Sequence, residues 1–386
     1  MSDGARLIEA TRDLPAPLAV VDEDALWSNA DDLVRRAAGV PIRVASKSVR
    51  VRGLVEETLA RPGFAGVMSY SAAESAWLVD HDVDDVLLAY PTVDAAAIRS
   101  IVDDDRRRAA ITLMVDGTGA LDAVDRVLGP RHPTVQVCLD VDASLRLGPV
   151  HLGVRRSPVH TPRQARRVAE TIANRPGFDL VGVMFYDAQI AGLPDSSPAV
   201  RLVKRRSAAE LLDRRAAVVE TVREVADLRL VNAGGTGSLE TTGADPVITE
   251  LTAGSGLFSP TLFDGYDAFQ GRPAAHFALD VVRRPTRDVA TCFGGGYIAS
   301  GPVGDSRAPT PVHPAGLSLL GSEGAGEVQT PVKGRAARHL QPGDRVLLRY
   351  AKAGEMCERF DAVHLVDAEG TVRTLPTYRG EGMNFG

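Results

Sequence analysis

A regular alternation of short apolar runs and amphipathic segments constrains the fold of this chain more than any other feature. Eight β-branched, nearly continuously apolar runs recur over the first two-thirds, as expected for parallel strands covered on both faces. Eight strand-helix units over roughly 250 residues favour a (β/α)8 barrel over an open doubly wound sheet. The runs lie at residues 42–46, 64–68, 85–89, 110–115, 135–139, 180–185, 228–232 and 249–252.

Amphipathic segments between these runs predict the outer helices of the barrel. They lie at residues 51–60, 72–79, 161–173 and 208–226. Ser71 with Glu74 three residues later has the spacing of a capping box, so we expect a helix to begin there. A further strand-like run at residues 18–21 is expected to lead into the first helix.

The character of the sequence changes from about Gly271. Short alternating runs at residues 290–300, 345–350 and 363–366, separated by turn signals, predict an all-β domain. The Pro- and Gly-rich stretch 301–334 predicts a long loop that could serve as a lid. We therefore expect a barrel domain over residues 1–268 and a C-terminal β-domain over residues 269–386, in keeping with a chain of this length.

Composition excludes several classes of protein. The chain has 44 Lys+Arg against 50 Asp+Glu, a formal net charge of -6, which argues against a dedicated nucleic-acid binder. Its three cysteines show neither a disulfide framework nor a C-x-x-C zinc motif. The sequence has no secretory signal and no apolar run long enough for a membrane span, so a cytoplasmic protein is expected.

Lys47 is the first candidate for covalent chemistry. The chain has only four lysines, Lys47, Lys204, Lys333 and Lys352. Lys47 falls at the carboxyl end of the first predicted barrel strand, which is where active sites of (β/α)8 barrels lie. A lysine buried there would have a lowered pKa and would form Schiff bases readily. The alternative is a lysine that extends to solvent at the barrel rim, and position alone leaves both interpretations open.

Two glycine-rich turns follow the last two predicted strands, at residues 231–238 and 253–256. Glycines let backbone N–H groups converge on an anion, and phosphate sites after strands 7 and 8 recur in barrels. One such turn is usually only a turn, but two of them opposite a strand-1 lysine predict a phosphate-bearing carbonyl compound attached to that lysine. Pyridoxal phosphate is the simplest cofactor of this kind.

Two further strand ends carry candidate residues. Arg146 follows the fifth strand and could reach a phenolic oxygen of the cofactor or a substrate carboxylate; alternatively it pairs with Asp140 or Asp142. Tyr186 follows the sixth strand and could pack on the cofactor ring, with Asp187 or Gln189 hydrogen-bonding nearby. The alternative for Tyr186 is an ordinary core tyrosine.

With these residues the sequence resembles the fold-type III pyridoxal phosphate enzymes, which include alanine racemase, D-threonine aldolase and eukaryotic-type D-serine dehydratase. The resemblance covers nearly the whole chain and is strongest to the aldolase and dehydratase branch, including the amino acid deaminase/aldolase group. It implies that Lys47 forms the internal aldimine and that Arg146, in an Asp-x-x-x-x-Arg-x-Gly element, contacts the cofactor, while Tyr186 and Gln189 remain cofactor candidates from their position after the sixth strand. It also implies phosphate contacts from Gly234, Gly235, Thr236, Gly237 and Ser238 and from Gly254, Ser255 and Gly256.

The sequence departs from that family at two places. The aldolases and dehydratases hold a divalent metal through a His-x-Cys or His-x-Asp pair in the C-terminal domain, and here Glu355-x-Cys357 keeps the spacing without the histidine. A carboxylate and a thiolate can both bind a metal, so Glu355 and Cys357 remain the metal candidates. At the second phosphate loop, the tyrosine usual in the aldolases is replaced by Gly256.

The resemblance implies a lyase that cleaves or forms a β-hydroxy-D-amino acid, with Lys47, Arg146 and Tyr186 as catalytic residues. A D-serine dehydratase-like ammonia-lyase, an amino acid racemase or epimerase, and a non-catalytic pyridoxal phosphate-binding protein remain alternatives, as does a phosphosugar aldolase without a bound chromophore. Small-molecule amino acids and aldehydes would be the partners, and the chain would form a homodimer in which the β-domain completes the active site. Tyr378 and Arg379 would then line a cleft, or the tail would pack on its own domain.

Overall fold

The computed structural model describes residues 2–386 and contains the predicted closed barrel of eight parallel strands. Hydrogen bonding between β11 and β2 closes the ring. Each predicted run coincides with one barrel strand, so the (β/α)8 prediction is confirmed. The strands are β2 Ile42–Ala45, β3 Phe64–Ser69, β4 Val86–Leu88, β5 Ile111–Val115, β6 Val135–Asp140, β9 Phe178–Phe185, β10 Leu230–Ala233 and β11 Glu250–Ala253.

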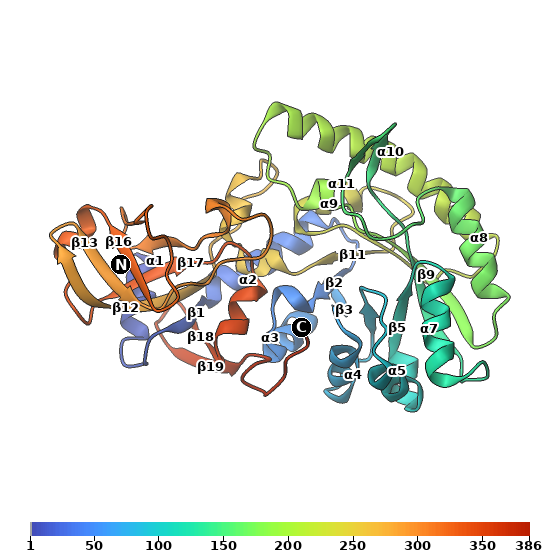
Figure 1. The fold of residues 1–386 in the computed structure, drawn as a ribbon, viewed down its shortest axis with the longest axis horizontal. Helices are drawn as coiled ribbons and strands as arrows, with labels where there is room; N and C mark the ends of the chain where they lie inside the picture. The colour runs from blue at the N-terminus through green and yellow to red at the C-terminus, as the bar shows by residue number, and fades with distance from the viewer. Residues whose placement is uncertain (1) are drawn as a thin grey trace. The chain divides into compact units, whose positions relative to one another are not determined.

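Helices follow the barrel strands, and Figure 1 shows α7, α8 and α10 flanking the strands β5 and β9. None of the helices in residues 2–386 is both long and apolar enough to cross a membrane. The helices from the first strand-helix unit onward are α2 Glu23–Arg36, α3 Arg52–Leu59, α4 Ala72–Asp80, α5 Ala95–Val102, α6 Asp105–Ala110, α7 Thr118–Leu128, α8 Pro162–Ala173, α9 Ala188–Ala191, α10 Pro198–Arg223, α11 Leu239–Gly243 and α12 Ser255–Phe258.

The predicted start of α4 is correct, but its capping differs in one detail. The Ser71 hydroxyl accepts from the Glu74 N–H at 3.2 Å, as a capping box requires. The Glu74 carboxylate instead accepts from the backbone N–H of Tyr70, at 2.7 Å. A complete capping box is found at the start of α8, between Thr161 and Gln164.

A buried arginine holds the amino-terminal end of the barrel. Arg43, on β2, is 2% exposed and donates to Glu250 at 2.8 Å and to both carboxylate oxygens of Asp85 at 2.9 Å. Burial lowers the pKa of Arg43, but its bonds and charge interactions with the two carboxylates outweigh this and raise it. The guanidinium therefore stays charged and links three barrel segments.

A second sheet, of nine mainly antiparallel strands, carries the predicted β-domain (Figure 1). It includes β1, the run expected to lead into the first helix, which pairs antiparallel with β12 and parallel with β18. The strands are β1 Leu18–Asp22, β12 Ala275–Thr286, β13 Val289–Phe293, β14 Thr310–His313, β15 Ser318–Leu319, β16 Gln329–Lys333, β17 Arg345–Arg349, β18 Ala362–Val366 and β19 Val372–Pro376. The helix α1, Asp3–Ala10, precedes β1.

The packing divides the chain differently from the expected boundary at residues 268 and 269. One compact unit, the β-unit, comprises the chain through Asp32, Lys47–Glu57 and Gly254–Asn384. The other, the barrel unit, comprises Leu33–Ser46, Thr58–Ala253 and Phe385–Gly386. The reason is the placement of β1, since its hydrogen bonds to β12 and β18 assign the first residues of the chain to the β-unit.

The long loop expected at residues 301–334 is wrong in part. This stretch contains β14, β15 and β16, and β16 pairs with both β13 and β15. Its glycines lie in the turns, where Gly316 and Gly324 have positive φ. Strands of two to five residues between such turns are too short for an alternating pattern to be recognised.

Candidate active site

Lys47 lies in a 3-10 turn, η1 Ser46–Ser48, that directly follows β2. Lys47 is half-buried, and its backbone carbonyl oxygen accepts a hydrogen bond from Arg50 Nε at 3.2 Å. The turn also contacts η6, Gly354–Arg359, because a Cβ built on Gly354 would lie 2.5 Å from the Lys47 carbonyl oxygen. The segment that carries the metal candidates therefore packs on the backbone of the lysine turn, within the β-unit.

The other three lysines lie in different settings. Lys204 is ion-paired with Asp195 at 2.8 Å, and 12% of its side chain is exposed. Lys352 donates to the hydroxyl of Ser300 at 2.7 Å, and Lys333 is exposed on β16. Lys47 is the one lysine of the described chain that follows a barrel strand.

The strand order corrects one expectation about the glycine turns. The barrel runs β10-β11-β2, with Ala253 of β11 in register with Val44 of β2. The strand before Lys47, β2, is thus hydrogen-bonded to β11, the strand before Gly254. In turn, β11 is hydrogen-bonded to β10, the strand before Gly234. The three segments leave the barrel from adjacent strands and not from opposite sides of the ring.

The first glycine turn is closely packed. Gly234 has φ +84°, a conformation that favours glycine. A Cβ on Gly235 would lie 2.8 Å from the Cβ of Ala191, so this position has no room for a side chain. Ser238 closes the turn, since its N–H donates to the Gly235 carbonyl at 2.9 Å and its hydroxyl accepts from the Gly235 N–H at 3.2 Å. Thr236 and Gly237 lie in the short helix η2, Thr236–Ser238.

Asp187, a buried carboxylate after β9, holds this turn in place. The hydroxyls of Ser238 and Thr242 donate to its two oxygens at 3.0 and 2.6 Å. Burial raises the pKa of Asp187, against the opposing effects of Arg215 and these two hydrogen bonds. The Ser238 hydroxyl is therefore hydrogen-bonded within the protein, where it stabilises the turn. The sequence offered Asp187 only as one of two possible hydrogen-bonding groups.

The second glycine turn starts the four-residue helix α12. Gly254 is its N-cap, and the Gly254 carbonyl accepts from the Leu257 N–H at 3.1 Å. Gly256 is buried and Ser255 is half-buried. This turn belongs to the β-unit, whereas residues 234–238 belong to the barrel unit.

Arg146 pairs with Asp142, one of the two alternatives that the sequence left open. It lies on a two-stranded hairpin formed by β7, Leu145–Leu147, and β8, Val150–Leu152. Its guanidinium donates to Asp142 at 2.5 Å, and 40% of its side chain is exposed. Burial raises the pKa of Asp142, but hydrogen bonds from Ser144 and Arg146 outweigh this and lower it.

Arg156, which sequence reasoning missed, lies between two tyrosine rings at the carboxyl end of the barrel. Its guanidinium carbon is 5.0 Å from the ring centre of Tyr186, after β9, and 5.4 Å from that of Tyr90, after β4. Both distances are within the range of cation–π attraction. Tyr186 thus packs on an arginine in this structure, and its packing on a cofactor ring stays a prediction.

Gln189 lies in α9 and is 4% exposed. Its Nε2 donates to the Ala143 carbonyl at 2.6 Å, which fixes the side chain. No hydrogen-bond partner for its Oε1 is found among the described residues. A buried acceptor of this kind is costly unless something donates to it.

Two carboxylates lie at the carboxyl ends of the adjacent strands β5 and β6. Val115 of β5 is in register with Leu139 of β6, which brings the next residues, Asp116 and Asp140, to the same level. Burial and the charge of Asp116 raise the pKa of Asp140 to about 7, although Arg156 opposes this rise. Asp140 therefore titrates near neutral pH.

Comparisons with known proteins bear on the fold. No protein-family model and no curated protein sequence matches this chain. A crystal structure of D-threonine aldolase from Filomicrobium marinum matches over 96% of each chain, with 19% identity and a TM-score of 0.80. This chain shares the fold of that structure. D-threo-3-hydroxyaspartate dehydratase from Delftia sp. HT23 matches with a TM-score of 0.77 and 18% identity, over 95% of this chain and 98% of that one. Alanine racemase from Corynebacterium glutamicum matches with a TM-score of 0.61 and 15% identity, over 86% and 88%. The resemblance seen in the sequence is thus confirmed at the level of the fold.

The metal candidates do not fit a metal ion. Both oxygens of Glu355 accept hydrogen bonds from Ser300, at 2.8 and 2.6 Å. Burial raises the pKa of the Cys357 thiol to about 12, although Arg50 opposes this, and a metal ligand must be a thiolate. The described residues contain no group of three or more His, Cys, Asp or Glu side chains arranged to hold a metal.

The C-terminal tail packs on its own unit. Tyr378 is 1% exposed, and its N–H donates to the Arg50 carbonyl at 2.9 Å. Arg379 pairs with Asp361 at 2.9 Å at the surface. The tail therefore packs on its own unit, as one alternative expected, and a cleft lined by these two residues in a dimer stays a prediction.

Proposed function

We propose that this protein is a pyridoxal phosphate-dependent enzyme acting on D-amino acids, and that it cleaves or forms β-hydroxy-D-amino acids. The observation that carries the proposal is the position of Lys47, directly after β2, with a glycine turn directly after each of the next two strands of the ring. In the aldolases that the sequence resembles, a lysine and two phosphate loops occupy these places. The residues proposed to catalyse are Lys47, Arg146 and Tyr186.

The residues present fit such a cofactor. In the turn at residues 234–238, the backbone N–H groups are the donors that an anion would meet. Gly235 has no room for a side chain beside Ala191, and the Ser238 hydroxyl is directed inward to Asp187. Gln189 Oε1 is a buried acceptor that no described residue satisfies. We propose that residues 234–238 and 254–256 hold the phosphate, and that Arg146, Tyr186 and Gln189 surround the ring. When bound, the cofactor would supply a carbonyl carbon for Lys47 and an electron sink for the reaction.

Lys47 has two roles in this proposal. Its Nζ would hold the cofactor, and an amino-acid substrate would take the place of the lysine. Once released, the Nζ amine is the group that accepts or returns a proton at the substrate α-carbon. No step is assigned to a metal ion, because Glu355 and Cys357 are committed to Ser300 and to the core.

A D-serine dehydratase-like reaction is the second candidate, and the likeness to D-threo-3-hydroxyaspartate dehydratase favours keeping it. The two reactions give different products from the same kind of substrate. Aldol cleavage gives an aldehyde and glycine, whereas dehydration gives a keto acid and ammonia. We further propose a cytoplasmic homodimer whose β-unit completes the site.

The experiment combines an absorbance spectrum with product analysis. Purified protein should show the band of a lysine-bound cofactor near the visible edge, and Lys47→Ala should lack it while Lys333→Ala, on exposed β16, should retain it. D-threonine and D-serine with the parent protein should give an aldehyde or a keto acid. An L-enantiomer as the product would instead indicate a racemase, and a band without turnover would indicate a non-catalytic binder. Identical spectra of the parent and Lys47→Ala would overturn the proposal.

A further inference from the structure

The backbone carbonyl of Lys47 is held from two sides by residues of the β-unit. On one side, Arg50 Nε donates a hydrogen bond to the Lys47 carbonyl oxygen at 3.2 Å. On the other side, the backbone of Gly354 lies so close that a Cβ there would be 2.5 Å from the same oxygen. Non-bonded atoms do not approach to that distance, so only glycine permits this contact. Two separate segments of the chain therefore fix the position of one carbonyl group.

Arg50 is itself fixed through both its side chain and its backbone. Its guanidinium forms an ion pair with Glu358 of η6, and only 13% of the Arg50 side chain is exposed. Its carbonyl oxygen accepts a hydrogen bond from the N–H of Tyr378, a buried residue, at 2.9 Å. The segment η6 thus supplies both Gly354, which contacts the lysine turn directly, and the carboxylate that orients Arg50.

The backbone of Arg50 has φ +55°, in the left-handed region that favours glycine. A residue with a Cβ is less stable in this region by about 1 to 2 kcal/mol. Such conformations persist where the surrounding structure holds them, and they gather at functional sites. The two contacts of the guanidinium, to the Lys47 carbonyl and to Glu358, offset the cost of this backbone conformation.

We propose that Arg50 is a positioning residue for Lys47 and acts with Gly354 as a clamp on the lysine backbone. The inference rests on the proposed function, in which the Lys47 Nζ bonds to the carbonyl carbon of the cofactor and the carbonyl oxygen leaves as water. Such a bond forms quickly only when the two atoms are held in the right geometry, and a misplacement of about 1 Å can slow a reaction about 100-fold. The clamp therefore sets the rate at which the lysine captures the cofactor, and not the affinity of the phosphate loops.

The test separates capture by the lysine from binding of the cofactor. Capture is the rate at which the absorbance band near the visible edge appears after pyridoxal phosphate is added to the full chain freed of cofactor. Binding is measured with pyridoxamine phosphate, which carries an amine in place of the aldehyde and cannot form a C=N bond with a lysine.

Arg50→Asn suits a positive φ and removes both contacts of the guanidinium. It should slow capture at least about tenfold and leave the affinity for pyridoxamine phosphate within about twofold of the parent. Arg50→Lys, which keeps a positive charge opposite Glu358, should recover part of the rate.

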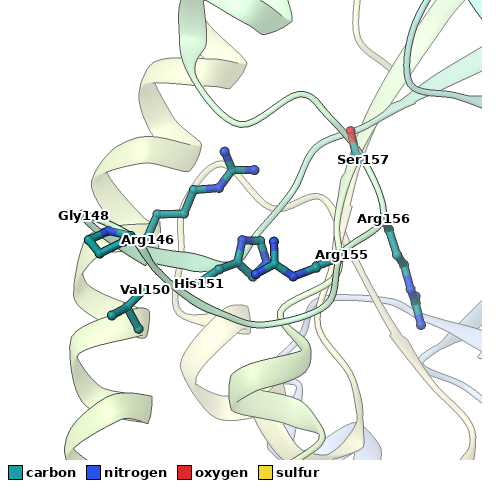
Figure 2. Close-up of a pocket in the computed structure, with 8 residues that line it drawn as sticks. Arg146, Gly148, Val150, His151, Arg155, Arg156 and Ser157 are labelled. Atoms are coloured by element: carbon teal, nitrogen blue, oxygen red, sulfur yellow. The ribbon is translucent and has the colours of Figure 1, made fainter.

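Gly354→Ala acts on the same carbonyl from the other side without changing a charge. Because its Cβ must displace the backbone of the lysine turn, capture should slow here too, again with little change in the affinity for pyridoxamine phosphate. Two controls match these variants. Gly296→Ala, also in the β-unit, brings a Cβ to 2.7 Å from the Cα of Glu327. Arg155→Gln removes a positive charge from the exposed loop after β8 (Figure 2). Both controls should capture the cofactor at the rate of the parent.

Equal capture rates of the parent and Arg50→Asn would overturn the clamp. An equal loss of capture and of pyridoxamine phosphate affinity would do the same, because Arg50 would then support the site as a whole and not the lysine in particular. A parent that forms no band with pyridoxal phosphate is a different result, which overturns the proposed function and the clamp with it.

Discussion

The two ends of the barrel hold an arginine in opposite ways, one buried and one exposed. At the amino-terminal end, Arg43 is 2% exposed and is neutralised by Asp85 and Glu250, with every interaction made inside the protein. At the carboxyl end, Arg156 is exposed, lies over the rings of Tyr90 and Tyr186, and interacts electrostatically with Asp140 without a direct ion pair among the described residues. The first arrangement serves stability. The second leaves the guanidinium at the surface, at the end of the barrel where active sites of this architecture lie.

Replacement of Arg43 should have the largest effect on stability. Arg43→Met leaves Glu250 and Asp85 facing each other without a cation, which should lower the free energy of unfolding by about 3 to 5 kcal/mol. Urea-induced unfolding followed by circular dichroism measures this. Arg43→Lys, which keeps the charge but not the paired hydrogen bonds, should lose less. Equal losses in the two variants would show that packing rather than charge holds this end of the barrel.

The acidic pair Asp116 and Asp140 should give a smaller effect on stability, one that depends on pH. Because burial and Asp116 raise the pKa of Asp140 to about 7 in the folded protein, the unfolded chain releases this proton first as pH rises. The contribution of Asp140 to stability is therefore lost between about pH 4 and pH 7. Relative to the parent, Asp140→Asn should gain about 2 kcal/mol on going from pH 5 to pH 8.

Urea midpoints at the two pH values provide that comparison. Asp84→Asn, at an exposed carboxylate before β4, serves as the control and should follow the parent. If Asp140→Asn also runs parallel to the parent between pH 5 and pH 8, the carboxyl end of the barrel does not hold a proton in the way described.

The smallest effect on stability is expected at Arg156 itself. Arg156→Gln removes two ring contacts but no ion pair of the described chain, so the free energy of unfolding should change by about 0.5 kcal/mol. A loss of stability as large as that of Arg43→Met would mean that the two arginines have the same structural role, and the comparison would fail.

The barrel was predictable because its signal is local. Each parallel strand is covered on both faces and so appears as an apolar run, such as residues 111–115 and 135–140. The pairing of β1 with β12 and β18 was not predictable, since its partners lie near the other end of the chain. The short strands β14 and β15 were hidden by the turns around them.

The candidate site divides in the same way. Lys47 and the two glycine turns follow strands that can be recognised, so the sequence locates them. The position of Arg156 depends on Tyr90 and Tyr186, which come from separate strands, and no spacing in the sequence indicates their contact. The metal candidates Glu355 and Cys357 kept a family spacing, but the hydrogen bonds from Ser300 and the burial of the thiol became visible only in three dimensions.

Peptide mapping after borohydride treatment tests the central claim most directly. Borohydride reduces the C=N bond between a lysine and its carbonyl cofactor and makes the link permanent, so mass spectrometry can assign it to one residue. We predict a pyridoxyl group on Lys47 and none on Lys204, Lys333 or Lys352. Modification of another lysine, or of none in protein saturated with pyridoxal phosphate, would contradict the account.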